Sequence, residues 1–462
     1  MKLFIYFFTR INAYIKDERS KRQFKNIVYS FVFKGASIIC SFLMVPLTLK
    51  FLDVTSYGIW LTITSIVSWI NFLDGGLGNG LKNKLSESIA LGDTKKSRTY
   101  IASTYGGIIF IVILILIIFF GTSFFVNWAS ILKAPVAISK DVIVAISIVF
   151  VCFGLRLIMD LINTILIANQ KVGTASIINF IINVVLLIGM FIITKFVVFH
   201  KLIYFSLFLC ISPLVILGLF TGYFFLNDYK NLRPSLSFFN RKVLKDILSL
   251  GIKFFVIQIA VIIIFSTDNL IITRLFSPAD VTIYNVAFKY FNVLTFAWTL
   301  IISPYWVAFN EAYIKEDFVW IKKTINTLEK TWLIFSLLVV IAFFLANTLY
   351  ELWIGKSVIV PQNLSLLMGL FVLISSLTNL YIYFINGIGK IKLQFWISIF
   401  AAAINLPLCF YLAGNLGFGI NGIIISTCIS VFPSLVLSRM QYLKIINNKI
   451  NKPLQTSSIW LK

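Results

Sequence analysis

The sequence predicts an all-α polytopic membrane protein with about 12 transmembrane helices in two pseudo-symmetric six-helix lobes. Three observations predict this class. Of the 462 residues, 59% are hydrophobic and only 12% are charged, whereas a soluble domain is nearer half apolar and a quarter charged. The mean hydropathy is +0.95. Apolar runs of about 20 residues, the length that crosses a bilayer, recur along the whole chain.

Twelve stretches have the length and composition of a span, and a basic linker at 227–246 divides them into two sets of six. The expected parts are therefore a basic N-terminal segment (1–26), an N-terminal lobe (27–226), a C-terminal lobe (247–441) and a basic tail (442–462). The N-terminal segment is either a solvated tail or an interfacial helix on an anionic leaflet. The expected spans lie at 27–51, 57–80, 100–126, 141–168, 174–194, 202–226, 247–273, 281–309, 331–352, 362–388, 393–413 and 418–441.

The distribution of basic residues predicts the orientation. The formal net charge is +23, but these charges lie between spans, so we expect no nucleic-acid partner. Alternating the loops between the two sides places 29 of the 40 Lys and Arg on one side and 7 on the other. By the positive-inside rule, both termini are expected to be cytoplasmic. Two of the inner loops, 81–99 and 310–330, are long and basic and occupy equivalent places in the two halves.

Four basic residues, Lys34, Arg156, Lys253 and Lys289, fall inside the expected spans. A cation in hydrocarbon costs about 2.5 to 3.5 kcal/mol on insertion scales, so such residues usually face a bundle interior or a watery cavity. A protein that keeps four of them is expected to handle something negative. Lys34 and Lys253 lie at matching depths near the cytoplasmic ends of spans one and seven. This placement favours either a symmetric pair at an inner mouth or side chains that snorkel to the headgroups.

Arg156 and Asp160 are four residues apart on span four, and Asn163 follows three later, so all three share one helix face. Two interpretations stay open. The pair either forms a salt bridge that pins this span to its neighbours, or it places a cation in a central cavity with a carboxylate modulating it.

Span eight carries one continuous polar stripe of Asn285, Lys289, Asn292, Thr299 and Ser303. Such a stripe favours a water-facing surface, and the alternative is a set of interhelical hydrogen bonds.

Three carboxylates remain at membrane depth: Asp74, Asp160 and Asp268. A carboxylate there can titrate or bind a cation and so couple transport to an ion gradient, or it can serve as a hydrogen bonder in helix packing. Asp268 is about 22 Å along the same helix from Lys253, so these two residues do not pair.

Signals of enzyme chemistry are weak, and we expect no catalytic residue, metal or cofactor. No GxxxxGK[ST] loop occurs, and Asp53 is the only acid in the first outer loop. The outer loops are too short for the large outer domain that membrane polysaccharide polymerases usually carry. The five cysteines lie in apolar runs without metal-ligand spacing, and His200 is the only histidine.

One stretch is specific. It reads WINFLDGGLGNGLKNKLSE over 69–87, continues with ALGD over 90–93, and is followed by Arg98 and Tyr100. Upstream, Pro46 and the pair Phe51-Leu52 precede YGIW at 57–60. These patterns resemble the bacterial polysaccharide flippases, the Wzx-type O-antigen and repeat-unit transporters of the multidrug/oligosaccharidyl-lipid/polysaccharide exporter superfamily. The glycines of the motif are expected to let this helix end bend or pack closely.

The resemblance implies a MATE-like fold, that of multidrug and toxin extruders, with a central cavity that opens alternately inward and outward. The implied cargo is an oligosaccharide on undecaprenyl diphosphate, moved across the bacterial plasma (inner) membrane for O-antigen (lipopolysaccharide), capsule or another surface polysaccharide. Membrane lipids, a polysaccharide polymerase and chain-length machinery are the implied partners. Asp74 becomes a latch near the cytoplasmic gate. The candidate substrate-binding residues are Arg156, Lys289, Lys34, Lys253, Asn285 and Asn292.

Three alternatives remain. An ion-coupled multidrug exporter of the same fold would bind organic cations and should have an acid-dominated lumen, whereas four basic residues face three acidic ones here. A membrane glycan polymerase or ligase is disfavoured by the short outer loops. A non-transporting scaffold of a glycan-assembly complex is the third.

Overall fold

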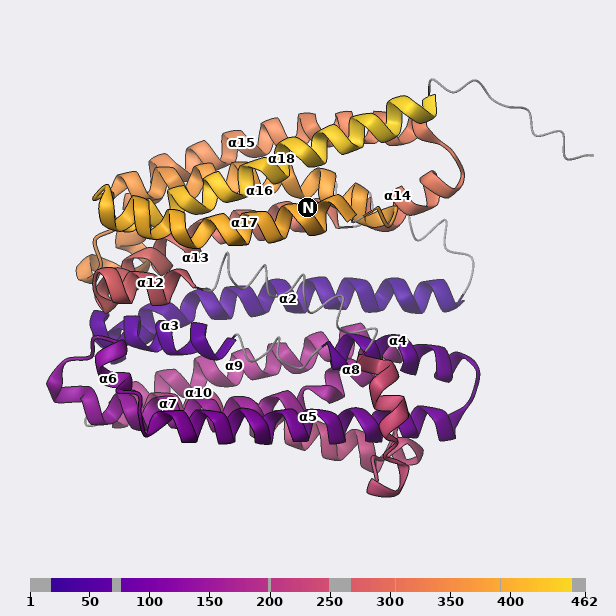
Figure 1. The fold of residues 1–462 in the computed structure, drawn as a ribbon, viewed down its shortest axis with the longest axis horizontal. Helices are drawn as coiled ribbons and strands as arrows, with labels where there is room; N and C mark the ends of the chain where they lie inside the picture. The colour runs from indigo at the N-terminus through magenta and orange to yellow at the C-terminus, as the bar shows by residue number, and fades with distance from the viewer. Residues whose placement is uncertain are drawn as a thin grey trace, which may run out of the picture. The chain divides into compact units, whose positions relative to one another are not determined.

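The structure is a computed structural model that describes residues 18–68, 76–197, 201–248, 267–303, 305–390 and 392–450. All regular secondary structure in these ranges is helical. The chain divides into two compact units, Met1–Gln258 and Ile259–Lys462, whose helices are labelled in Figure 1. Asp74, Lys253 and His200 lie outside the described residues, as does most of the basic N-terminal segment.

Long helices make up most of the first unit, with two short 3-10 turns in the segment after α10. Its elements are α2 (Glu18–Phe51), α3 (Val54–Ser68), α4 (Leu77–Ala90), α5 (Thr94–Ser123), α6 (Trp128–Ile131), η2 (Val136–Ile138), α7 (Ser139–Met159), α8 (Leu161–Ala168), α9 (Val172–Phe196), α10 (Lys201–Leu226), η3 (Lys230–Leu232) and η4 (Leu236–Phe238).

The second unit has the same character. Its described elements are α12 (Asp268–Leu275), α13 (Pro278–Ile302), α14 (Tyr305–Ile314), α15 (Phe318–Ile354), η5 (Gly355–Ser357), α16 (Gln362–Gly387), α17 (Lys392–Phe410), the π-helical turn η6 (Tyr411–Asn415) and α18 (Ile420–Ile450).

Among the described residues, ten helices are long and apolar enough to cross a membrane. They correspond to ten of the twelve expected spans. The second expected span is represented by α3, which is apolar but shorter, and most of the seventh, 247–273, lies outside the described residues. The predicted class, an all-α polytopic membrane protein, is confirmed.

The two long inner loops, expected at 81–99 and 310–330, are mostly helical. In the second unit, α15 begins at Phe318 rather than near 331. Its first turns bury Phe318, Ile321, Ile325 and Leu328, a spacing of three and four residues that defines one apolar helix face. Charged residues occupy the other face, which is why a search for continuous apolar runs places the helix start too late.

Span four is interrupted at Asp160, between α7 and α8. The Asp160 amide still donates to the Arg156 carbonyl oxygen at 2.8 Å, but the Asn163 amide donates to the Asp160 carbonyl oxygen at 3.0 Å, a shorter turn. The Asn163 side-chain amide also donates to Asp160 Oδ1 at 2.9 Å. Asn and Asp side chains compete with the helical ladder in this way, so the break arises locally.

In the first unit, α2 packs along α9 and α7 packs along α10. The α2–α9 contact includes Ser30 Oγ at 2.8 Å from Ser176 Oγ and the rings of Phe33 and Phe180, 5.3 Å apart. Small and hydroxyl-bearing residues let transmembrane helices approach closely. Ser176 therefore serves helix packing.

Residues 227–248, which we call the linker strap, lie against α4 and α5. Arg98 Nε donates to the Arg233 carbonyl oxygen at 2.8 Å, and its guanidinium lies 4.2 Å from the centre of the Phe238 ring. The Asn240 amide donates to Ser103 Oγ at 3.0 Å. The strap is thus attached to the first unit through polar and aromatic contacts.

Glycines make this approach possible. A Cβ atom at Gly80 would lie 2.6 Å from the Ile247 carbonyl oxygen, and one at Gly107 would lie 2.6 Å from a methyl carbon of Leu244. Gly76, at the start of α4, has a φ of 75°, in the left-handed region that favours glycine. The expectation of close packing at the glycine motif thus has a structural counterpart at Gly80.

In the second unit, α16 lies at the centre and packs on α13, α14, α15 and α18. Ser376 of α16 accepts from two tryptophans: Trp298 Nε1 donates to its carbonyl oxygen and Trp332 Nε1 to its hydroxyl, both at 2.8 Å. Tyr381 of α16 donates to Glu329 Oε1 of α15 at 2.6 Å. These bonds pair polar groups that would otherwise be costly to bury.

Candidate functional site

Arg156 lies in the last turn of α7, just before the break in span four. Its Nε is 4.0 Å from Asp160 Oδ2, longer than the 2.7 to 3.2 Å of a hydrogen bond. The two side chains remain 37% and 42% exposed, so the guanidinium is not locked by its carboxylate. Because Asp160 also accepts from Asn163, its charge is shared between two neighbours. Arg156 therefore keeps donors available for another anion, since a guanidinium has five N–H groups.

Lys34 is exposed on α2. Its neighbour Phe33 contacts α9 through Phe180, and a Cβ at Gly35 would meet open space. Lys34 therefore lies outside the α2–α9 contact. Its expected counterpart Lys253, and the gate candidate Asp74, lie outside the described residues.

The expected polar stripe forms on α13, but its members have different surroundings. Asn285 is held: its side-chain amide donates to Asn269 Oδ1 at 2.7 Å and to the Val281 carbonyl oxygen at 2.9 Å. Lys289 is half-buried and Asn292 is exposed. The first residue of the stripe thus links α12 to α13, while the middle of the stripe is more open.

Asp268, the first residue of α12, is 5% exposed. Tyr284 of α13, itself buried, donates its hydroxyl to Asp268 Oδ2 at 2.7 Å. The other carboxylate oxygen, Oδ1, is buried and has no hydrogen-bond partner among the described residues. A buried acceptor without a partner costs about 1 to 3 kcal/mol, and more when it is charged. Asp268 therefore has capacity for a proton or a cation.

A buried polar cluster on α17 and α18 accompanies this carboxylate. Asn405, Cys409, Ser426 and Thr427 are all at most 1% exposed. Cys409 Sγ lies 2.6 Å from Ser426 Oγ, and the Asn405 side-chain amide is 3.5 Å from Thr427 Oγ1. The Cys409 thiol is near enough to Asp268 for an electrostatic interaction.

Sequence reasoning found the charged residues but missed several of their partners. It did not identify Tyr284 as a donor to Asp268, or Asn269 as the partner of Asn285. Asn269 directly follows Asp268, and an acid-amide pair at membrane depth is a signal that could have been used. Asn405 lies alone in an apolar span, so only its burial reveals it. No cluster of three metal-ligating His, Cys, Asp or Glu side chains occurs among the described residues.

Comparison with known proteins assigns the family. Residues 24–307 match the family described as "Polysaccharide biosynthesis protein". A protein of Yersinia pseudotuberculosis named "Putative O-antigen export protein" is 24% identical over 399 residues, which cover 84% of this chain and 88% of that protein.

Solved structures of similar fold are multidrug transporters. The inward-facing conformation of a multidrug resistance MATE family transporter of the MOP superfamily superposes with a TM-score of 0.76 at 14% identity, covering 92% of this chain and 99% of that one. An outward-facing conformation of such a transporter gives a TM-score of 0.61, also at 14% identity, over 91% of this chain and 96% of that one. This likeness confirms the predicted MATE-like fold, and by its sequence the chain belongs to the polysaccharide biosynthesis protein family.

Proposed function

We propose that this protein is a flippase that moves a polyprenyl-diphosphate-linked oligosaccharide repeat unit from the inner to the outer leaflet of the plasma membrane by alternating access. The product would be a building block for O-antigen, capsule or another surface polysaccharide. Support comes from membership of the polysaccharide biosynthesis family and from the name of the Yersinia relative, an O-antigen export protein.

The observation that carries the proposal is Arg156. A guanidinium inside a broken span is expected to be neutralised by a close carboxylate, yet its Nε stays 4.0 Å from Asp160. Arg–phosphate pairs are charge-assisted and often bidentate, and the geometry of a guanidinium matches two phosphate oxygens. Arg156 would therefore bind the diphosphate. Lys289 would add a second charge, with Asn285 and Asn292 beside it on α13 offering hydrogen bonds to sugar hydroxyls.

The remaining candidate residues would serve substrate entry, gating and ion coupling. Lys34 and Lys253 would meet the incoming diphosphate near the cytoplasmic mouth, and Asp74 would latch the gate. Both termini would be cytoplasmic, as the asymmetry of Lys and Arg between loops favours. Asp268, buried with one oxygen that has no partner among the described residues, would couple transport to a proton or sodium gradient, and Asp160 would modulate Arg156. A polymerase and chain-length machinery would then use the flipped unit.

The proposal makes the protein a transporter rather than an enzyme. A multidrug exporter of the same fold is the alternative, and the four intramembrane cations disfavour it because they would repel organic cations. A glycan polymerase or ligase lacks support in the short outer loops.

The test uses surface glycan production in a host strain that lacks the gene. Arg156→Ala should abolish surface glycan while the protein stays in the membrane, and Arg156→Lys should retain part of it because the charge is kept without the bidentate geometry. Lys289→Ala should also reduce surface glycan strongly. Membrane-fraction immunoblots would separate lost transport from lost protein.

A matched control is Lys140→Ala, which removes one exposed positive charge from the first turn of α7 and should leave surface glycan unchanged. Wild-type glycan levels in both Arg156→Ala and Lys289→Ala would overturn the proposal that these cations bind the cargo.

A further inference from the structure

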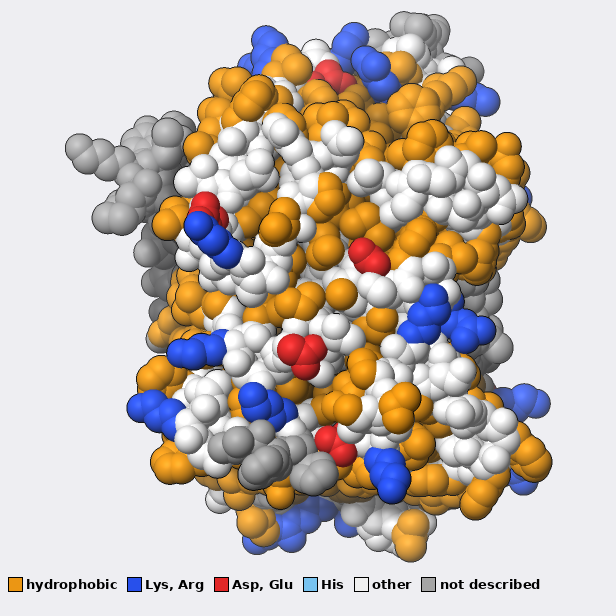
Figure 2. Space-filling model, turned by 90° about the vertical axis from the view of Figure 1, so that its left-hand side faces the viewer, with side chains coloured by type: hydrophobic (Ala, Val, Ile, Leu, Met, Phe, Trp, Pro, Cys, Tyr) orange, Lys and Arg blue, Asp and Glu red, His pale blue; other side chains and the backbone are white. Residues whose placement is uncertain are grey.

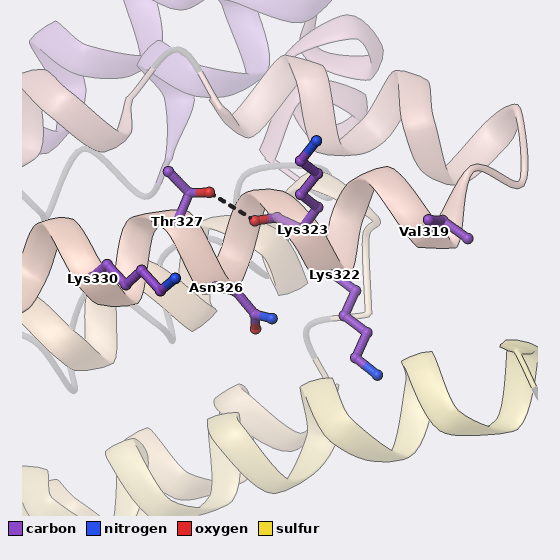
Figure 3. Close-up of a pocket in the computed structure, with 6 residues that line it drawn as sticks. All are labelled: Val319, Lys322, Lys323, Asn326, Thr327 and Lys330. Atoms are coloured by element: carbon purple, nitrogen blue, oxygen red, sulfur yellow. Dashed lines mark hydrogen bonds between the residues drawn. The ribbon is translucent and has the colours of Figure 1, made fainter.

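A basic pocket lies on the first turns of α15, in the segment that extends beyond the expected span. It has a volume of about 560 Å³ and is lined by Val319, Lys322, Lys323, Asn326, Thr327 and Lys330 (Figure 3). In Figure 3, Lys322 and Asn326 extend from one side of the helix and Lys323 and Thr327 from the other. The ammonium end of Lys330 points back toward Asn326. Three positive charges thus gather within little more than two helical turns.

These three charges are not neutralised by neighbouring acids. No ion pair joins Lys322, Lys323 or Lys330 to a carboxylate within the described part of the chain. Glu329, next to Lys330 in sequence, is engaged by the Tyr381 hydroxyl at 2.6 Å, in the contact between α15 and α16. Asp317, just before the helix, accepts from the Trp320 amide at 2.9 Å as the N-cap. Both acids are therefore committed elsewhere, and the pocket stays positive.

The helix face that carries Lys330 continues into an apolar face that is exposed within the second unit. Leu333, Leu337 and Phe344 are 61%, 59% and 73% exposed, and they follow Lys330 at spacings of three, four and seven residues, which keep one helix face. Exposed apolar side chains on a transmembrane helix are suited to contact with acyl chains. The change from basic to apolar thus occurs close to residue 331, where the expected span begins.

From this continuity we propose that the pocket binds the phosphate headgroup of an anionic phospholipid, whose acyl chain lies along the exposed face of α15. Charge complementarity selects an anionic headgroup, because clusters of Lys beside a transmembrane helix attract anionic lipids. Asn326 and Thr327 add amide and hydroxyl groups that can donate to phosphate or glycerol oxygens. The lipid would hold the cytoplasmic end of α15 at headgroup level. This proposal does not rest on the flippase function, because its ligand is an ordinary membrane lipid.

The test is native mass spectrometry of the purified full-length protein in detergent, titrated with phosphatidylglycerol or phosphatidylcholine of the same acyl chains. Wild type should retain phosphatidylglycerol in preference to phosphatidylcholine. The triple variant Lys322→Gln, Lys323→Gln, Lys330→Gln should bind phosphatidylglycerol about a hundredfold more weakly, since each lysine near an anionic surface contributes about fivefold to the affinity. The smaller change Lys330→Gln should give an intermediate loss if the triple variant does not stay folded.

The control is Lys95→Gln, Lys96→Gln, Lys242→Gln, which removes the same charge from exposed positions of the first unit and should retain phosphatidylglycerol as wild type does. Equal retention by the two triple variants, or equal retention of the two lipids by wild type, would overturn the proposal. Displacement of the lipid by inorganic phosphate at equal concentration would also overturn it, because the pocket would then recognise phosphate rather than a lipid.

Discussion

Two charged side chains inside spans, Arg156 and Asp268, have opposite surroundings. Arg156 keeps more than a third of its side chain exposed and pairs loosely with Asp160 at 4.0 Å. Asp268 is buried, with one hydroxyl donor and one oxygen without a partner among the described residues. A half-exposed cation can bind a large anion, whereas a buried carboxylate suits a proton or a small cation. The two sites thus favour different roles in one transport cycle.

The role of Asp268 can be tested with a near-isosteric change. Asp268→Asn keeps the shape and an oxygen that accepts from Tyr284, but it removes the negative charge. For the proposed cargo, a radiolabelled polyprenyl-diphosphate-linked oligosaccharide, wild-type translocation between the leaflets of membrane vesicles should rise when a proton or sodium gradient is imposed. In Asp268→Asn this rise should vanish, while thermal unfolding in detergent stays close to wild type.

Tyr411→Phe, at an exposed tyrosine, is the control and should keep the response to the gradient. If wild-type transport does not change with either a proton or a sodium gradient, Asp268 has no role in coupling.

Sequence alone singled out these charged residues but did not predict their contacts. Charged side chains are costly at membrane depth, so Arg156, Lys289 and Asp268 stand out in the sequence. The partners could not be predicted, because Tyr284 reaches Asp268 from the next helix. Such a pairing depends on the register between helices, which hydropathy does not encode.

At the scale of elements, ten of the twelve expected spans recur as long helices among the described residues, but their ends and interruptions differ. The amphipathic start of α15 and the break at Asp160 both come from polar residues, which a search for apolar length treats as boundaries or ignores. Local hydrogen bonding explains the break, and burial of one face explains the extension. The sequence contains both features, the amphipathic helix start and the polar residues at the break. A search for long apolar runs does not detect either of them.

Close packing of α4 on the linker strap predicts a sharp difference between two glycines. At Gly80 an added methyl group would meet the backbone of Ile247 at 2.6 Å, whereas at Gly35 it would meet open space. Gly80→Ala should therefore destabilise the protein, by about 1 to 3 kcal/mol as for other overpacked sites. Gly35→Ala should be neutral or stabilising by up to about 1 kcal/mol, because alanine favours helix. Thermal unfolding in the same detergent compares them; equal melting temperatures would contradict the packing argument.

The end of α10 is tied to the turn between α8 and α9 by Lys171, whose Nζ lies 2.8 Å from Asp228 Oδ2 and 5.3 Å from the centre of the Tyr229 ring. Burial alone would lower the pKa of Lys171, but the hydrogen bond to Asp228 and the charges of Asp228 and Tyr229 raise the pKa overall. Burial also raises the pKa of Tyr229. Both shifts favour the protonated forms in the folded state.

A group whose pKa is higher in the folded than in the unfolded protein stabilises the fold fully at pH values below its unfolded-state pKa. This stabilisation is lost as the pH rises through its folded-state pKa. The contribution of this pair should therefore be constant near neutral pH and fade only above about pH 10.4, the unperturbed value for lysine. Asp228→Asn should lower the melting temperature equally at pH 7 and pH 9, and the gap to wild type should narrow at higher pH. A gap that already narrows between pH 7 and pH 9 would show that the stabilisation has another source.

For the whole molecule, composition and apolar run length predicted the class, an all-α polytopic membrane protein. In Figure 2, hydrophobic side chains lie between areas of uncharged polar side chains and backbone, and Lys and Arg are scattered with a few Asp and Glu, as expected for a membrane protein with few charges. Orientation rests on the distribution of Lys and Arg between loops. The short Gly-rich motif added the family, because its position at the end of the second expected span is specific. The contacts between helices could not be predicted from the pattern, since many arrangements of helices satisfy the same hydropathy.

Orientation predicts which positions a membrane-impermeant maleimide can reach in intact spheroplasts. Lys133→Cys and Lys356→Cys lie at the expected outer ends of the two units, and Lys96→Cys and Lys323→Cys at the inner ends; all four positions are exposed. The first two should be labelled in intact spheroplasts and the last two only after lysis. The wild-type protein, whose five cysteines are free, gives the background. Labelling of Lys96→Cys or Lys323→Cys without lysis would reverse the proposed orientation.

The attachment of the linker strap also bears on how this protein is tagged. Hydropathy predicts a linker between two spans at 227–246, the usual place to insert a fluorescent reporter or an epitope. Arg98, Ser103 and Gly80 hold this segment against α4 and α5, so a reporter inserted there would displace part of the folded first unit. Residues 91–93, the exposed turn between α4 and α5, offer a more tolerant insertion point on the same side of the membrane.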